Sequence, residues 1–471
     1  SSARMEITMA DSQKGKIDMT TGHIMKNIIL FAIPIIIGNV LQQLYTTVDA
    51  LVIGKYCGDT SLAAVGTSSQ PVEVLLCVFL GIGTGVSILI SQYTGARESG
   101  KVVSVCGTSI TFIYIVGIPI GILGWFAAPY ILEFMKVPQD VWNAALIYTR
   151  VVFLGTLGNL GYNMNAGILR GLGDSKASLW FLVVSCVSNI VFDLLFVAGF
   201  GMDVDGAALS TSIAMFISWI VSIVYIRKKF PEIQFTYLPR RFSVTMMKDI
   251  LAIGLPVGLN NSLYSLGHVA LQTFNNSQGA IFMAGGAVAG RITGCSNIAI
   301  TGLSSAATTF SGQNYGAKKY SRIKEGHWRI PICSGLITLS FGLFFIMIHK
   351  PIIRFFSSDE MVLMYASRHI VVMLLSQWFF AIFNCIISIV NGTGKVRYTT
   401  IVNILMLWAV RIPSAYIINR YFDGTWVMLC FPISFSFGMF AMIGYYLFSP
   451  AWKEVMRMAG KKQNEGEKNL A

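Results

Sequence analysis

Charged residues are scarce in this sequence. They make up 12% of its 471 residues, whereas 54% are hydrophobic. An ordinary soluble domain carries about 25% charged residues, so the composition excludes that class. Motifs of catalysis are missing too, because the chain holds no HExxH, GxSxG or phosphate-binding loop. Its eight cysteines have no CxxC or metal-site spacing. We therefore expect a protein that is not an enzyme, has no cofactor and does not use ATP.

Long apolar runs fill most of the chain instead. A bilayer core of ~30 Å needs a helix of roughly 20 apolar residues. The sequence offers twelve such stretches separated by short polar turns, which predicts an all-α polytopic membrane protein with twelve transmembrane helices. The predicted spans are 27–53, 62–94, 102–128, 141–169, 177–199, 206–227, 247–275, 281–314, 328–348, 362–391, 397–419 and 425–448.

The formal net charge of +13 is distributed unevenly over the connecting loops. Lysines and arginines gather after the even-numbered spans, for example at 227–229, 318–322 and 453–457. Basic loops stay in the cytoplasm, and an even number of spans places both termini there. The basic excess thus indicates topology, and we expect no nucleic-acid partner.

The two halves of the chain repeat each other. The segment SQYTGAR at 91–97 matches GQNYGAK at 312–318, and RGLG at 170–173 matches NGTG at 391–394. Both pairs lie 221 residues apart, six helices further along, which predicts a parallel repeat about an axis along the membrane normal. We expect two pseudo-two-fold-related six-helix lobes. The predicted parts are a cytoplasmic segment at 1–26, a first lobe at 27–229, a linker at 230–246, a second lobe at 247–448 and a cytoplasmic tail at 449–471.

Several of these motifs together resemble one known family. They include Pro34 followed by QQLY at 42–45, Val48-Asp49, the QYTGA turn at 92–96 and the RGLGD turn at 170–174. Over nearly its full length the chain resembles multidrug and toxic compound extrusion (MATE) transporters, and most closely their archaeal-type, DinF-like branch. The resemblance implies a V-shaped fold of two lobes that works by alternating access, with an ion gradient driving export.

Acidic residues inside the predicted spans are costly to insert, by at least ~2.5 kcal/mol, so each is a functional candidate. The first lobe holds three, Asp49, Glu73 and Asp193. Asn189 and Asp193 are four residues apart and share one helix face. Thr211 and Asn163 supply further oxygens, and such a ligand set suits a hard cation.

The resemblance implies that Asp49, Asn189, Asp193 and Thr211 form a Na+ site. The same two carboxylates could carry a proton instead, since protonation and Na+ binding are alternative ways to neutralise one cluster. A third reading is that the two acids only form hydrogen bonds that stabilise the lobe. The sequence leaves these alternatives open.

A substrate cavity is predicted from polar, aromatic and Met residues on several spans. Pro34 is predicted to bend the first helix and to act as a hinge. Between Leu251 and Pro450 all acidic residues fall in predicted loops, so we expect no Na+ site in the second lobe. The cavity candidates are Glu73, Gln42, Tyr45, His268, Met283 and Arg411.

These observations predict an antiporter, coupled to Na+ or H+, that exports amphipathic and cationic organic compounds. The alternative is a flippase for a lipid-linked saccharide, which Arg291 and Arg411 would suit and the first-lobe acids would not. From the resemblance we expect a monomer in the bacterial inner membrane, in contact with lipid.

Overall fold

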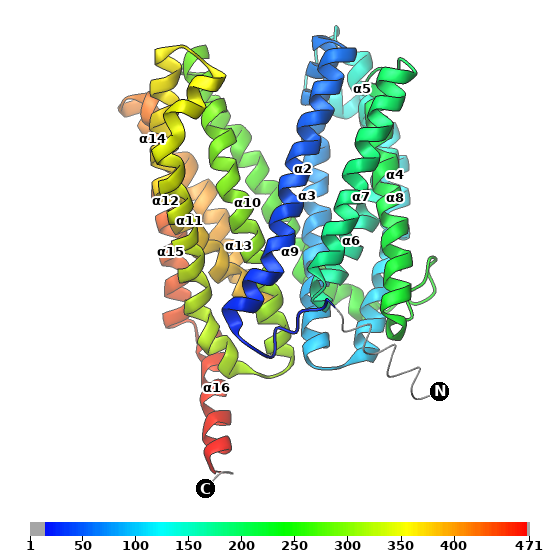
Figure 1. Ribbon diagram of the computed structural model, residues 1–471, viewed down its shortest axis with the longest axis vertical. Helices are drawn as coiled ribbons and strands as arrows, with labels where there is room; N and C mark the ends of the chain where they lie inside the picture. Colours follow the sequence, from blue (N-terminus) through cyan, green and yellow to red (C-terminus); the bar gives the residue numbers. More distant parts are fainter. Residues whose placement is uncertain (1–14, 469–471) are drawn as a thin grey trace. The chain divides into compact units, whose positions relative to one another are not determined.

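The computed structural model describes residues 15–468, and within that range the chain is all-helical, without a strand (Figure 1). Because every backbone polar group in a helix is satisfied within its own segment, this is the architecture that lipid requires. The predicted all-α membrane class is thus confirmed. By their contacts, the residues divide into two compact units.

The first unit is built from six helical spans. Its fourth span is a pair, α5 and α6, bent by 48° at Gly155, and its fifth ends in the π-helical turn η1. The helices are α2 (Ile24–Tyr56), α3 (Asp59–Gly95), α4 (Ser99–Phe134), α5 (Trp142–Leu154), α6 (Thr156–Leu172), α7 (Ser175–Asp193), η1 (Leu194–Gly199) and α8 (Val204–Lys229).

The second unit repeats this order, and its fifth span again contains a π-helical turn, η3. A short 3-10 helix, η4, opens its sixth span, and α16 follows at the end. The helices are α9 (Val244–Asn276), α10 (Ala280–Gly316), α11 (Tyr320–Phe356), α12 (Glu360–Gly392), α13 (Val396–Ile404), η3 (Leu405–Arg411), α14 (Ile412–Tyr421), η4 (Gly424–Leu429), α15 (Cys430–Phe448) and α16 (Pro450–Lys468).

Helices α2 and α9 each contribute to both units. Residues Met19–Ala32 belong to the second unit and Ile33–Ser262 to the first, so the change falls inside α2 and again inside α9. The predicted lobes were divided at the linker 230–246 instead. The difference arises because hydropathy marks where a helix begins, whereas the packing of its two ends decides to which unit each end belongs.

Nine of the described helices are long and apolar enough to cross a membrane, and the bent pair α5 and α6 would make a tenth. The two remaining predicted spans, 247–275 and 281–314, correspond to α9 and α10. These helices have 33 and 37 residues, more than the roughly 20 that a bilayer needs, but their sequences are richer in Asn, Ser, Thr and Gly. Their composition, not their length, sets them apart.

Glycines bring α3 close to two neighbouring helices of the first unit. A Cβ added at Gly85 would lie 2.7 Å from the backbone nitrogen of Gly254 in α9. One added at Gly83 would lie 3.0 Å from the carbonyl oxygen of Asn163 in α6. Small residues allow helix backbones to approach in this way inside a membrane, where van der Waals packing is a main source of helix association.

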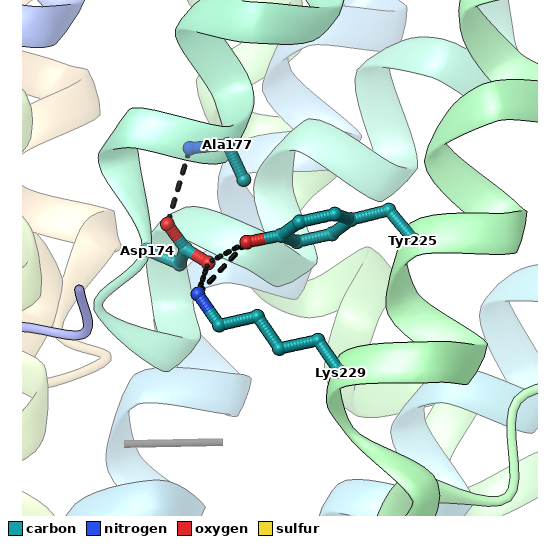
Figure 2. Close-up of polar contacts among 4 residues, drawn as sticks. All are labelled: Asp174, Ala177, Tyr225 and Lys229. Carbon is teal, nitrogen blue, oxygen red and sulfur yellow. Dashed lines mark hydrogen bonds and ion pairs between the residues drawn. The ribbon is translucent and has the colours of Figure 1, made fainter. Parts of the chain in front are cut away.

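A buried ion pair fixes the start of α7 (Figure 2). The carboxylate of Asp174 caps the helix by accepting a hydrogen bond from the backbone N–H of Ala177 at 3.1 Å. Its other oxygen accepts from the Tyr225 hydroxyl at 2.7 Å and from the Lys229 ammonium at 2.8 Å, both on α8. Asp174 is 1% exposed, so these partners compensate a charge that would otherwise be costly to bury.

The predicted linker packs on α4 within the first unit. Thr111 donates from its hydroxyl to the carbonyl of Arg241 at 2.8 Å, and the Ser243 N–H donates to the Thr108 hydroxyl at 3.3 Å. The predicted tail, as far as residue 468, forms α16. Trp452 at its start is fully buried, with its ring stacked on Tyr446.

Candidate functional site

Two carboxylates face each other inside the first unit. Asp49 lies in the second half of α2 and Asp193 at the last residue of α7, and their carboxyl groups are within hydrogen-bonding reach. Asp193 is fully buried, and Asp49 is half-buried. Neither acid forms an ion pair with a cation of the described residues. Both oxygens of Asp193 and Oδ1 of Asp49 are buried without a hydrogen-bond donor. Such a pair needs a proton or a cation.

Asn189 and Thr211 are in contact across two helices. Asn189 lies one turn before Asp193 on α7, and Thr211 lies on α8. The Asn189 amide nitrogen donates to the Thr211 hydroxyl at 3.1 Å, and that hydroxyl donates to the Ala207 carbonyl at 3.2 Å. Asn189 is 1% exposed, and its Oδ1 has no partner. A buried acceptor without a donor is costly, so this oxygen is suited to a cation.

The backbone next to this site departs from a regular α-helix. The π-helical turn η1 starts directly after Asp193. Turns of this kind are uncommon and occur frequently at functional sites. Ser210 on α8 lies beside Asp193, with its hydroxyl bonded to the Gly206 carbonyl at 2.8 Å.

Asn163 has partners of its own on α6. Its amide nitrogen donates to the carbonyl oxygen of Asn159 at 2.9 Å and to the Asn159 side-chain oxygen at 2.8 Å. None of the described contacts joins Asn163 to Asp49 or Asp193. Its predicted role as a ligand therefore gains no support from the geometry.

Glu73 lines a cavity of about 190 Å³ within the first unit. Its side chain is exposed, and the cavity also reaches Tyr148, Asn159 and Thr211. Tyr148 lies close enough to Asp49 and Asp193 to interact with them electrostatically. The cavity thus extends from an exposed carboxylate to the residues around the buried pair.

The remaining first-unit candidates lie on α2. Gln42 is exposed, and Tyr45 is half-buried within hydrogen-bonding reach of it and near both carboxylates. Pro34 is buried inside α2, which continues as a helix on both sides of it. The change of unit inside α2 falls between Ala32 and Ile33, directly before this proline. The hinge stays a prediction.

The second-unit candidates do not form one group. Met283, on α10, is 38% exposed, whereas Arg411, at the end of η3, is fully buried. His268 on α9 is exposed and touches the ring of Tyr264, which accepts a hydrogen bond from Arg411 at 3.0 Å. Only His268 and Arg411 are therefore linked.

Among the side chains that the structure describes, no three His, Cys, Asp or Glu residues come close enough to hold a metal ion. A cation at the carboxylate pair would therefore take its further ligands from the oxygens of Asn189 and Thr211. The alkali cations accept such oxygen ligands.

Sequence reasoning missed Tyr148, Asn159 and Ser210. Each stands in an apolar run where a single hydroxyl or amide gives no signal, and only the packing of α5, α6 and α8 places it at the cavity or the acids.

Comparisons with known proteins agree with this arrangement. The family model MatE matches the chain twice, at residues 34–195 and 256–417, once in each repeat. "Probable multidrug resistance protein YoeA" of Bacillus subtilis is 29% identical over 91% of this chain and 95% of its own length. "Probable multidrug resistance protein NorM" of Thermotoga maritima is 26% identical over 88% and 90%.

Among solved structures, "Crystal structure of MATE in complex with MaD3S" superposes with a TM-score of 0.82 at 25% identity, covering 96% of this chain and 99% of that one. The two family-model matches together span more than half of the sequence. The chain belongs to the MatE family and is a multi-pass membrane transporter.

Proposed function

We propose that this protein is an antiporter that exports amphipathic, cationic organic compounds in exchange for Na+ or H+. The observation that carries the proposal is the facing pair Asp49 and Asp193, which has no cation of the described chain beside it. Several relatives are named multidrug resistance or multidrug export proteins, and these names support the export of drugs.

Coupling would follow from how the pair is neutralised. Two close carboxylates cannot both stay ionised in a dry site, so one proton shared between them stabilises the cluster. A Na+ ion held by Asp49, Asp193 and the free oxygen of Asn189 would do the same. A proton or Na+ that enters from outside the cell would stabilise the conformation that binds it better. Release of that ion into the cytoplasm would complete its exchange for the exported compound.

The cavity beside Glu73 supports the choice of substrate. An exposed carboxylate at its edge attracts a cation, and its other lining residues are largely apolar, such as Val72, Leu76 and Met215. Its volume of about 190 Å³ is smaller than the ~300–1,000 Å³ of a typical drug site. It would therefore receive the charged end of a substrate.

The proposal also includes the location. Basic loops support a plasma membrane orientation with both ends of the chain in the cytoplasm, and we propose a monomer that works without ATP or nucleic acid. Protease cleavage of right-side-out and inside-out vesicles would check the orientation.

The test is efflux of a fluorescent organic cation from proteoliposomes under an imposed Na+ gradient at equal pH, or a pH gradient without Na+. We expect one gradient to drive efflux, and Asp49→Asn and Asp193→Asn each to abolish it. Asp140→Asn, in an exposed turn, makes the same chemical change and should transport normally. Normal transport by both site variants would overturn the assignment, and no efflux of any cation would favour the flippase.

A further inference from the structure

The second unit holds a buried cation on its fifth span, the span that carries Asn189 and Asp193 in the first unit. The matched turns directly before the two fifth spans, at 170–173 and 391–394, lie 221 residues apart. This separation leads from Asn189 to Val410 and from Asp193 to Ser414. The second unit thus has no acid at these two positions, and Arg411 directly follows the counterpart of Asn189.

Arg411 is fully buried, and its charge has no counterion within the described chain. Its Nε donates to the Ser434 hydroxyl at 2.9 Å and its Nη1 to the Tyr264 hydroxyl at 3.0 Å. Its Nη2 is buried without a partner. The guanidinium also lies over the rings of Phe431 and Phe435, at 4.9 and 5.0 Å. The neutral hydroxyls and ring faces offset part of the cost of removing the guanidinium from water. They leave the Nη2 donor without an acceptor and the positive charge of Arg411 without a counterion.

A cavity of about 60 Å³ lies near this guanidinium. Arg411 is not among its lining residues, but Phe431, whose ring the guanidinium covers, lines it, and so does Leu271. Two histidines border it, His268 from α9 and His369 from α12. Even a neutral imidazole offers one N–H donor. The cavity is too small for a drug-sized molecule, which needs ~300 Å³ or more.

From these contacts we infer that the second unit contains an anion subsite, formed by Arg411, His268 and His369, which takes a halide ion or a single carboxylate group. A guanidinium presents paired N–H donors to a carboxylate, and the two histidines would close the site from the other helices. The acids that lie between residues 251 and 450 are Glu325, Asp359, Glu360 and Asp423. Glu325 pairs with Arg329, and Glu360 pairs with Arg354. Asp423 accepts a hydrogen bond from the Thr425 hydroxyl. None of these three acids therefore forms an ion pair with Arg411.

The test is bromide binding to the purified full-length protein, independent of transport. The melting temperature is followed while bromide replaces methanesulfonate at constant Na+ and ionic strength. We expect a saturable rise for the natural protein. Arg411→Gln and His369→Leu should each weaken bromide binding by about tenfold or more. Arg291→Gln removes one charge from an exposed arginine of the same unit and should bind bromide normally.

Absence of saturation in the natural protein would overturn the inference, and so would equal binding by Arg411→Gln or, if that variant does not fold, by His369→Leu. A second arm separates the two sources of the anion. If a transported compound supplies it, a fluorescent zwitterion with a carboxylate should be exported faster than its methyl ester, and bromide should compete. Equal export of acid and ester, with bromide binding intact, assigns the subsite to a halide from solution.

Discussion

The amide nitrogen of Asn189 donates a hydrogen bond to the hydroxyl of Thr211 at 3.1 Å, which leaves the amide oxygen of Asn189 buried and without a donor. The bond fixes which end of the amide is directed at α8 and so orients the free oxygen. An acceptor held in this way lowers the reorganisation needed to bind a cation.

Thr211→Val keeps the side-chain shape and removes the hydroxyl. Asn189 then loses its partner, and we expect the apparent affinity for the coupling ion to fall about fivefold, the value of one ordinary hydrogen bond. The measurement is the ion concentration that gives half-maximal efflux. Thr273→Val, on an exposed position of α9, should leave it unchanged. An unchanged value in Thr211→Val would exclude this hydroxyl from the site.

Asp174→Ala should lower the stability of the first unit. The change removes the cap of α7 and leaves the Lys229 ammonium, whose side chain is 16% exposed, without its counterion. We expect a loss of ~3 kcal/mol, and ~1 kcal/mol for Tyr225→Phe, which removes one hydroxyl. Denaturation of the detergent-solubilised protein measures both. Equal losses in the two variants would contradict the role of the ion pair.

Gly85→Ala should disturb the contact between α3 and α9. The new Cβ would meet the backbone of Gly254 at 2.7 Å, and backbone atoms cannot yield without moving the helix. Overpacking of this kind costs ~1–3 kcal/mol. Gly66→Ala on the same helix is the control, because its Cβ has no atom within 4 Å. A melting temperature of Gly85→Ala as high as that of Gly66→Ala would show that the helices separate easily.

Burial of Lys16 should make the stability of the folded protein depend on pH in the alkaline range. Burial lowers the pKa of Lys16 below its usual range, against the opposing effect of Glu232, Asp18 and Asp174. Between that lowered pKa and the unfolded value of about 10.4, the unfolded chain binds more protons than the folded one. Stability linked to this group therefore rises with pH across the window, and Lys16→Met should remove this part of the rise.

The measurement is the melting temperature against pH up to about 10, the range set by the lysine pKa. Lys26→Met, at an exposed position, makes the same change in charge. If both variants have the same slope, burial of Lys16 is not the cause of the rise.

Hydropathy and repeats determined the fold class before any coordinates. Apolar runs must become helices in lipid, and the matched turns at 91–97 and 312–318 reveal the duplication, because both signals are written along the chain. The same reasoning drew attention to Asp49 and Asp193, since a charge within an apolar run is expensive wherever the helix packs. It also showed that between residues 251 and 450 the acids fall only in the predicted loops.

Only the tertiary structure decided which of these polar groups meet. Asp49 and Asp193 come from α2 and α7, and their contact depends on how those helices are rotated and packed, which no local pattern encodes. Asn163 has the same residue type as Asn189, yet it bonds within α6. The division of α2 and α9 between two units, and the cavity near Arg411, arise in the same way from contacts between helices distant in sequence.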